Sequence, residues 1–432
     1  MSEWCKSRLG EISNISIGGT PSRAEPTYWV SEGEEGTPWV SISDLKRRLV
    51  TNTAESITIL GARNSNVKLV PAGTIMMSFK LSLGRIAVAS RDLYTNEAIA
   101  SFEIDTDKID KTFLFYQLPE VVKHAITDTA IKGATLNKAK LNELIIPHPE
   151  LKTQGRIAEI LLTIDNQIDA TQALINKYTA IKQGMMADLF SRGIDPETKA
   201  FRPTFEEAPE LYHETSLGML PKGWGVTPLG AISEKITSGS RDWAKFYAPE
   251  GDLFVRISNL TREHINFRWD SVRYVYIGSG SEGERTQLKL NDILISITAD
   301  LGIVGVVPES IGRAYINQHT ALVRLFPEGE NARFIGNFLS SRCGQKQFEK
   351  NNDSGAKAGI NLPTIASLLC PIPLPEEQAA IASRIDSIDK VIADYKFEKL
   401  KSILLKQGLM QDLLTGKVAV PAQTNHKKNM AA

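Results

Sequence analysis

Six short segments of this 432-residue chain contain the residue types that contact nucleic acids. Lys, Arg, Ser, Thr and bare backbone N–H groups bind phosphate, whereas Arg, Asn, Gln and Lys read base edges. Three segments lie in the first half of the chain and three at corresponding places in the second half. The candidates are Thr20, Ser22, Arg23, Ser43, Lys46, Arg47, Arg48, Lys132, Thr135, Asn137, Lys138, Ser238, Ser240, Arg241, Arg256, Asn259, Arg262, Lys357 and Asn361. Each segment alone could be a solvated polar loop, but their recurrence favours DNA binding.

The motifs with which an enzyme of this size usually works are absent from the sequence. The chain has no GxxxxGK[ST] phosphate loop, no [DN]PP[YF] motif and no HExxH, and its six histidines lack metal-ligand spacing. Gly278 to Gly283 spell GxGxxG, but polar residues follow where a helix should begin, so a surface loop is favoured over a nucleotide site. We therefore predict no catalytic residue, no metal site and no cofactor bound by this chain.

The composition limits how the chain could bind DNA and where it works. Lys plus Arg equals Asp plus Glu at 50 each, so any DNA affinity must be arranged locally or shared with partners. Cys5, Cys343 and Cys370 are scattered, which argues against disulfides and zinc. No apolar run reaches the length of a bilayer and the first residues lack the apolar core of a signal peptide. We therefore expect a cytoplasmic protein without a membrane segment.

A repeat indicates which elements position the candidate segments. KQGMMADLF at residues 182–190 returns as KQGLMQDLL at residues 406–414, and Asp165 returns as Asp389, always with an offset of 224 residues. A constant offset over roughly fifty residues indicates a continuous helix, because one inserted residue would rotate everything downstream by about 100°. Upstream, the repeat is weaker and its offset varies. The chain is thus a tandem duplication of a variable globular unit followed by a helical unit.

The variable units are expected to be α+β domains. In the first, short strands are predicted over residues 37–42, 73–79 and 85–89, and a helix over residues 111–128. Because strands lead and helices trail, a twisted or barrel-like sheet is favoured over a doubly wound fold.

The helical units carry the apolar stripe of a coiled coil. Ile157, Leu161, Ile164 and Ile168 step alternately by four and three. An isolated stripe of this kind is unstable in water, so the two helices are expected to pair with each other. Antiparallel pairing would place the two variable units at opposite ends of a rod with pseudo-two-fold symmetry. A helix over residues 154–190 would be about 55 Å long, on the order of one and a half turns of B-DNA.

The repeat and the change of period predict the domain organisation. The segment between the copies is rich in Pro, Gly and acidic residues and has neither helical nor strand period, so it is predicted to be an extended linker. The predicted parts are a first variable domain at 1–150, a helix at 151–192, the linker at 193–223, a second variable domain at 224–374, a second helix at 375–416 and a flexible tail at 417–432.

Several motifs resemble the specificity (S) subunits of type I restriction-modification systems. They are the doubled KQGxMxDL helix end, PxPxxxxQxxI from Pro147 and again from Pro371, PKGW from Pro221, and IxxGxTPSR from Ile15. The resemblance extends from Trp4 to about residue 420 and implies that the two variable domains are target recognition domains and that the two helices are conserved spacers. One departure is that Thr153 stands where the second copy has Glu377.

The resemblance implies a non-catalytic DNA-recognition subunit that reads a bipartite double-stranded target with an unread spacer. Two methyltransferase (M) subunits would dock on it and bring S-adenosylmethionine for adenine methylation. Restriction (R) subunits would add translocation and cleavage driven by ATP and Mg. The alternative from another class is a coiled-coil scaffold with two protein-binding heads.

The helix faces opposite the pairing stripe are expected to contact the partner subunits. Gly184 and Gly408 occupy equivalent positions inside the helices, where glycine costs roughly 1 kcal/mol relative to alanine, so a close-packing reason such as a helix crossing is expected. Met186 and Met410 could alternatively pack within the rod. The candidate partner-binding residues are Lys182, Gln183, Met186, Lys406, Gln407 and Met410.

Overall fold

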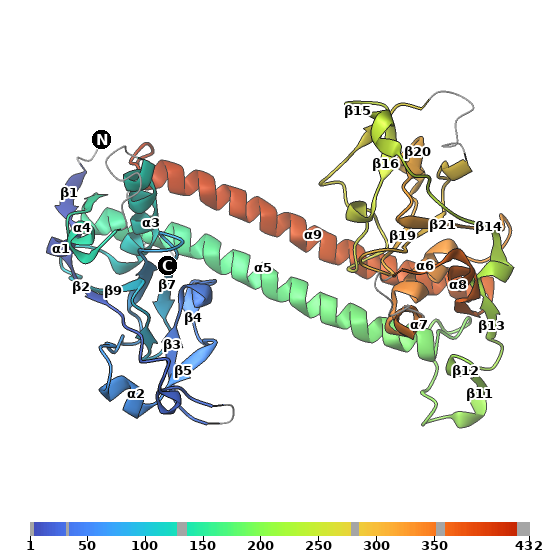
Figure 1. The fold of residues 1–432 in the computed structure, drawn as a ribbon, viewed down its shortest axis with the longest axis horizontal. Helices are drawn as coiled ribbons and strands as arrows, with labels where there is room; N and C mark the ends of the chain where they lie inside the picture. The colour runs from blue at the N-terminus through green and yellow to red at the C-terminus, as the bar shows by residue number, and fades with distance from the viewer. Residues whose placement is uncertain (1–3, 32–33, 128–135, 278–284, 351–358, 421–432) are drawn as a thin grey trace, which may run out of the picture. The chain divides into compact units, whose positions relative to one another are not determined.

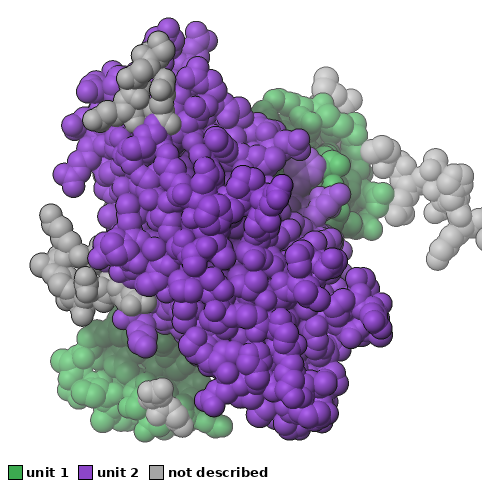
Figure 2. Space-filling model, turned by 90° about the vertical axis from the view of Figure 1, so that its right-hand side faces the viewer, with its two compact units in different colours: residues 1–171, 398–432 green, residues 172–397 purple. Residues whose placement is uncertain are grey.

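The computed structural model describes residues 4–31, 34–127, 136–277, 285–350 and 359–420. The chain forms two compact units, unit 1 (residues 1–171 and 398–432) and unit 2 (residues 172–397), which Figure 2 distinguishes by colour. Each unit contains a recognition domain and a segment of both long helices, whereas the predicted domain ranges treated the helices as separate parts. Some sequence candidates lie outside the described residues: Lys132, Thr135, Lys357, the glycine-rich segment 278–283 and the tail after residue 420.

The first recognition domain consists of short strands followed by helices, as expected (Figure 1). Its strands are β1 (Cys5–Arg8), β2 (Ser13–Ile17), β3 (Thr37–Val40), β4 (Leu49–Val50), β5 (Glu55–Ile57), β6 (Ile75–Ser78), β7 (Ile86–Ala89), β8 (Tyr94–Thr95), β9 (Ile99–Ile104) and β10 (Ile145–His148). Its helices are α1 (Leu9–Ile12), α2 (Ile59–Arg63), α3 (Lys111–Thr127) and α4 (Lys138–Asn142), and α5 (Leu151–Ser191) follows.

The second recognition domain follows α5 and a linker, and it is built in the same order (Figure 1). Strands β11 (Tyr212–Thr215) and β12 (Gly218–Pro221) lie in the linker, and the strands of the domain are β13 (Gly225–Pro228), β14 (Ser233–Ser238), β15 (Tyr247–Ala248), β16 (Asp252–Val255), β17 (Tyr274–Val275), β18 (Ile293–Ser296), β19 (Val304–Val306), β20 (Ala314–Ile316), β21 (Thr320–Leu325) and β22 (Leu369–Ile372). Its helices are α6 (Ala332–Ser340), α7 (Arg342–Lys350) and α8 (Leu362–Ser367), and α9 (Pro375–Leu413) follows.

The two recognition domains share the core order of their sheets, and each adds one strand that the other lacks, β4 in unit 1 and β15 in unit 2. Unit 1 has a sheet of order β2-β9-β6-β7-β4, and unit 2 has the corresponding sheet β14-β21-β18-β19. A second sheet has the order β5-β3-β8 in unit 1 and β15-β17-β16-β20 in unit 2. In each second sheet one pair of strands is parallel, with Val40 opposite Thr95 in unit 1 and Val255 opposite Ile316 in unit 2. The duplication inferred from the sequence therefore extends through the sheets as well as the helices.

The central strand of each main sheet is apolar because it separates two cores. Successive side chains of a strand point to opposite faces. In unit 1, Ile75 and Met77 enter the core that contains α3, whereas Met76 enters the smaller core on the other face. In unit 2, Ile293 and Ile295 face the larger core, and Leu294 faces the smaller one. Apolar side chains of α5 and α9 complete the larger core of each unit, so each domain is packed firmly onto the helices.

A repeated glutamine joins each long helix to the domain that precedes it. In unit 1, the Gln154 side chain accepts a hydrogen bond of 2.7 Å from the backbone N–H of Asp110, just before α3. In unit 2, Gln378 accepts one of 2.9 Å from the N–H of Asn331, just before α6. Both glutamines are buried, so each satisfies a backbone donor that would otherwise be buried without a partner.

Within each unit the segments of α5 and α9 pair antiparallel. In unit 2, Lys182 Nζ lies 2.5 Å from Asp389 Oδ1, and the rings of Tyr178 and Tyr395 stack with centroids 5.5 Å apart. Residue numbers rise along α5 as they fall along α9, which defines the direction. In unit 1 the repeated pair, Lys406 Nζ and Asp165 Oδ1, lies at 2.7 Å. Antiparallel pairing of the two copies is therefore confirmed inside each unit.

The linker prediction is wrong in one respect, because residues 193–223 contain a β-hairpin. β11 and β12 pair antiparallel with Tyr212 opposite Pro221, and such four-residue strands are too short to show a period in the sequence. Glu377 anchors the linker, since its buried carboxylate accepts hydrogen bonds from Arg202 and from the Ile194 N–H. At the equivalent place in unit 1, the Thr153 hydroxyl instead donates to the Glu150 carboxylate at 3.4 Å. The substitution does not move the helix start, because α5 begins at residue 151 and α9 at residue 375.

Candidate nucleic-acid interface

Both recognition domains present a polar loop at the same end of the main sheet. β2 ends at Ile17 and β14 at Ser238, and a glycine follows each strand. A Cβ atom on Gly18 would overlap the backbone oxygens of Thr95 and Asn96, and one on Gly239 would overlap those of Ile316 and Asn317. Glycine is thus required for the close approach of the loop to the neighbouring strand end. The two loops start from equivalent positions and then diverge in sequence.

In unit 1, Arg23 is held on this loop by an acid and an aromatic ring. Its two terminal nitrogens donate to the two carboxylate oxygens of Glu55, with Nη2 to Oε2 at 2.9 Å. Its guanidinium carbon lies 3.7 Å from the ring centroid of Trp29. The Arg23 side chain is nevertheless 54% exposed, so it is fixed in position and still accessible. The hydrogen bond from Arg23 lowers the pKa of Glu55, which keeps the carboxylate ionised.

The second candidate segment of unit 1, residues 43–48, lies close to the loop that carries Arg23. The Asp44 side chain accepts from the Ser41 N–H at 2.8 Å and from the Ala54 N–H at 3.2 Å, which ties this turn to the residue before Glu55. Ser43 is exposed on the turn, as are the two basic residues that follow, Lys46 and Arg47. Among the described residues no carboxylate forms an ion pair with either of these basic side chains.

Two further residues of unit 1 have structural partners that the sequence did not reveal. Arg48 donates to the Asn166 side chain of α5 at 3.1 Å, so it links the turn to the helix. Thr20 donates to the Glu97 carboxylate and thereby lowers the pKa of Glu97. Glu55 and Glu97 were not among the candidate residues, because the residue types expected to contact DNA are donors to phosphate and bases, whereas these acids hold such donors in place. Ser22 is exposed beside Arg23, as a binding role requires.

The third candidate segment of each domain serves mainly to begin a helix. The Asn137 side chain accepts from the Lys140 N–H and caps α4, and Asn361 accepts from the Thr364 N–H and caps α8. Asparagine is a favoured N-cap residue, and these two asparagines are 224 residues apart, so the repeat itself indicated a shared structural role. Lys138 is exposed on the first turn of α4.

In unit 2 the loop after β14 is held by a residue that the sequence analysis did not select. Arg285 donates to the Thr237 hydroxyl, and its Nη2 lies 3.5 Å from the Ser240 hydroxyl. Ser238 is half-buried and Arg241 is exposed. Arg285 was missed because it is brought to the loop only by the folding of a distant segment.

The remaining candidates of unit 2 have internal roles. Asn259 is a correction, since it is only 3% exposed and its amide donates to the backbone oxygens of Arg268 and Ser271. It holds the turn closed and cannot reach a base. Arg256 is half-buried and donates to the Ser271 hydroxyl at 3.0 Å. Arg262 is exposed but forms an ion pair with Asp300 at 2.5 Å.

The partner-binding candidates divide between the two faces of the helices. The placement of Lys182 and Lys406 opposite the pairing stripe is wrong, because both form ion pairs with the opposite helix. The spacing offered a signal, since Lys182 follows Ile168 and Ile175 at successive steps of seven. Met186 and Met410 are half-buried and pack against the larger core of unit 2 and of unit 1, respectively. The partner-binding role of these residues stays a prediction.

Gln183, Gln407 and the two repeated glycines are exposed on the outer surface of the helices. The expected close packing at Gly184 and Gly408 is wrong within the described part of the chain, because an added Cβ would meet no atom within 4 Å at either position. The surface around each glycine is therefore open.

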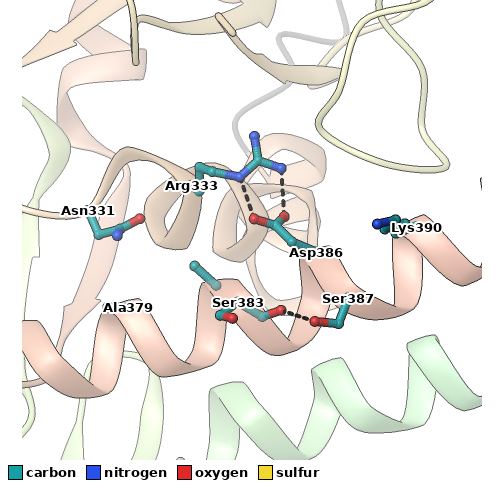
Figure 3. Close-up of a pocket in the computed structure, with 8 residues that line it drawn as sticks. Asn331, Arg333, Ala379, Ser383, Asp386, Ser387 and Lys390 are labelled. Carbon is teal, nitrogen blue, oxygen red and sulfur yellow. Dashed lines mark hydrogen bonds and ion pairs between the residues drawn. The ribbon is translucent and has the colours of Figure 1, made fainter. Parts of the chain in front are cut away.

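A groove of about 370 Å³ lies between the start of α6 and the outer face of α9 in unit 2 (Figure 3). Its main polar feature is the bidentate pair of Arg333 and Asp386, with both contacts at 2.6 Å. This pair fastens α6 to α9 and leaves Lys390 as the other cation that lines the groove. The ion pair that lines this groove thus attaches the domain to the helix.

The described residues contain no group of three or more His, Cys, Asp or Glu that could hold a metal ion. A search of the same residues finds no helix with both the length and the apolar character required to cross a membrane. The three cysteines are free thiols, with Cys370 buried and the other two exposed.

Two domains with the same core sheet order, each packed on an antiparallel helix pair and each presenting different polar loops, define a tandem recognition protein. The chain belongs to the family of the type I restriction modification DNA specificity domain, which matches residues 1–180 and 221–404. This is the family that the motifs resembled, and the α+β tandem architecture agrees with it. The chain is thus of the DNA-recognition class and not of the catalytic class.

Curated relatives and solved structures agree with this assignment. The type I restriction enzyme MjaVIII specificity subunit of Methanocaldococcus jannaschii is 26% identical over 319 residues, 72% of this chain and 71% of the relative. The EcoBI specificity subunit of Escherichia coli is 22% identical over 398 residues, 89% of this chain and 79% of the relative. The crystal structure of the type I restriction-modification S subunit from M. genitalium has the same fold, with a TM-score of 0.57, 14% identity and coverage of 98% and 97%.

Proposed function

We propose that this chain reads a bipartite DNA target, one half-site with each recognition domain, and leaves the bases between them unread. One observation carries the proposal: the same core sheet order and the same glycine-supported loop occur twice, with different side chains on the two loops. A shared scaffold with unlike loops suits the reading of two unlike half-sites, because base readout depends on a few side chains held in register.

The chain would act as the targeting component of a type I restriction-modification complex in the cytoplasm. Two M subunits would dock on the helices and domains and methylate adenine in each half-site, and R subunits would add translocation and cleavage. S-adenosylmethionine, ATP and Mg would all be bound by these partners and none by this chain. The formal net charge of zero supports shared DNA binding, since a chain without excess positive charge gains little from phosphate attraction alone.

The test uses the full chain purified together with its M subunits. The complex is footprinted on duplex DNA selected from a random library, and adenine methylation is mapped in a host that expresses it. Two protected patches separated by an unprotected gap, with methylated adenines in both patches, are expected. A single continuous patch, or methylation without a shared sequence, would overturn the proposal. The chain without M subunits serves as the control and should methylate nothing.

A further inference from the structure

We propose that Arg23 reads a guanine in the half-site recognised by unit 1, and that Glu55 and Trp29 position its guanidinium for this contact. The inference rests on the proposed function and names a specificity-determining residue within it.

The guanidinium keeps one complete edge free for a base. An arginine side chain offers paired N–H groups along two edges, Nη1 with Nη2 and Nε with Nη2. Glu55 occupies the first edge, since its oxygens accept from Nη1 and Nη2. Among the described residues none accepts a hydrogen bond from the Nε–H of Arg23, so the second edge is open. Two parallel N–H groups match the O6 and N7 acceptors of guanine in the major groove.

The side chain is also held still before any DNA arrives. Its guanidinium lies 3.7 Å from the Trp29 ring centroid and 5.1 Å from that of Trp39. Trp39 is only 3% exposed, and its indole N–H donates to the Gly19 backbone oxygen at 2.9 Å, so the aromatic support is itself fixed. A preorganised side chain loses less conformational freedom on binding, which favours discrimination between bases.

The charge around Arg23 favours a base over a phosphate. Glu55 neutralises the guanidinium, and the charges of Glu97 and Asp44 act within the same neighbourhood. A phosphate oxygen placed at Arg23 would therefore meet several carboxylates, whereas the uncharged guanine edge would not. Lys46 and Arg47, which are exposed on the adjoining turn, are better suited to phosphate.

Unit 2 supports its loop by different chemistry. There Arg285 donates to Thr237, and Trp243 is buried against Phe254 and Tyr315 instead of supporting an arginine on the surface. A change at Arg23 should accordingly alter one half-site and leave the other unchanged.

The experiment selects binding sequences from a randomised duplex library with the complex of the full chain and its M subunits. Arg23→Lys keeps the charge but loses the paired N–H edge, so preference for guanine at one position of the unit 1 half-site should fall by about 10- to 100-fold. Glu55→Gln should weaken the same preference in part, because its amide can accept only on one side. Arg47→Gln is the matched control and should reduce binding to all sequences equally without changing any preference.

The outcomes separate this inference from the proposed function. If the wild-type complex selects no sequence, the proposed function fails. If the wild-type complex selects two half-sites but Arg23→Lys leaves every base preference intact, or weakens all sequences equally, Arg23 is not a base reader and the inference fails. Arg23 is exposed and Glu55 is half-buried, so co-purification with M subunits and an unchanged melting temperature are the check that each variant is folded.

Discussion

At the scale of single residues, the structure separates side chains that hold the protein together from those that remain free to bind. Lys182 and Asp389 are 8% and 5% exposed, so their ion pair is buried between the helix segments of unit 2. Lys182 also donates to the Glu263 backbone oxygen at 2.8 Å. The repeated pair in unit 1 is more accessible, with Lys406 24% exposed, and the Tyr116 hydroxyl also donates to Asp165 at 2.6 Å. The two ion pairs therefore occupy equivalent positions in the repeat. The aspartate of unit 2 relies more on its lysine, because the aspartate of unit 1 also accepts a hydrogen bond from Tyr116.

Replacing Lys182 with methionine should destabilise unit 2 by about 3 kcal/mol, because Asp389 would remain buried without its cation. The double variant Lys182→Met with Asp389→Leu should recover most of this loss, and Lys406→Met should cost less, since Tyr116 still donates to Asp165. Urea unfolding, with hydrogen exchange to locate the change, measures each effect. If the single and double variants were equally unstable, the charge would not be the cause.

The loss in Lys182→Met should also depend on pH. Burial raises the pKa of Asp389, and Lys182 opposes that rise. Without the lysine, the folded-state pKa rises further above the unfolded value of about 3.9, so the folded state retains a proton that the unfolded chain has released. The stability of the variant relative to wild type is thus greatest below about pH 4 and declines as pH rises through the folded-state pKa. A deficit that stays constant across that range would contradict this assignment.

The asparagine caps give a second prediction at this scale. Asn361→Ala should destabilise α8 by about 1 kcal/mol, because the Thr364 N–H loses its acceptor, whereas Asn361→Asp should keep the cap. Neither change should alter base preference in the library selection. A changed preference with unchanged thermal stability would show that Asn361 reads DNA instead of capping the helix.

At the scale of elements, the regular features were predictable and the contacts between distant segments were not. The continuity of both long helices followed from a constant offset, because a helix tolerates no insertion without rotating its apolar stripe. The ion pair at Lys182 could have been found from its spacing of seven from Ile175. The pairing of Arg23 with Glu55 could not, since it depends on where β5 pairs with β3, which no local pattern specifies.

The two exposed glycines allow stability and partner binding to be tested apart. Gly184→Ala with Gly408→Ala should stabilise the isolated chain by about 1 kcal/mol per site, because the new methyl groups meet open space and alanine favours the helix. Gly184→Leu with Gly408→Leu should also leave the chain folded. If M subunits approach the helices here, the affinity of the chain for M subunits should fall in the order glycine, alanine, leucine. The free energy of unfolding of the isolated chain should not fall in that order. Equal affinity in all three would exclude this surface as a docking site.

At the scale of the whole molecule, the unlike loops and the like helices suggest separable functions. The sequence was sufficient for the tandem organisation, because the helices keep one constant offset of 224 residues and so delimit the two domains along the chain. It was insufficient for the loops proposed to read DNA, because these loops have diverged and their supports, such as Arg285 and Glu97, come from distant parts of each domain. The proposed base readout depends on those supports, and for that reason motif comparison alone does not give the target bases.

The final prediction concerns how helix length relates to the unread gap. The design inserts seven residues in each long helix, between Asp165 and Lys182 in α5 and between Asp389 and Lys406 in α9. These matched insertions preserve the apolar stripe and both ion pairs. Each helix would lengthen by about 10 Å, so the gap between half-sites should grow by about three base pairs while the half-sites stay the same. An insertion in α5 alone forces one ion pair out of register, so it should instead abolish assembly. Methylation mapping of the complex measures the gap, and a gap that stays unchanged after the matched insertions would contradict this expected dependence on helix length.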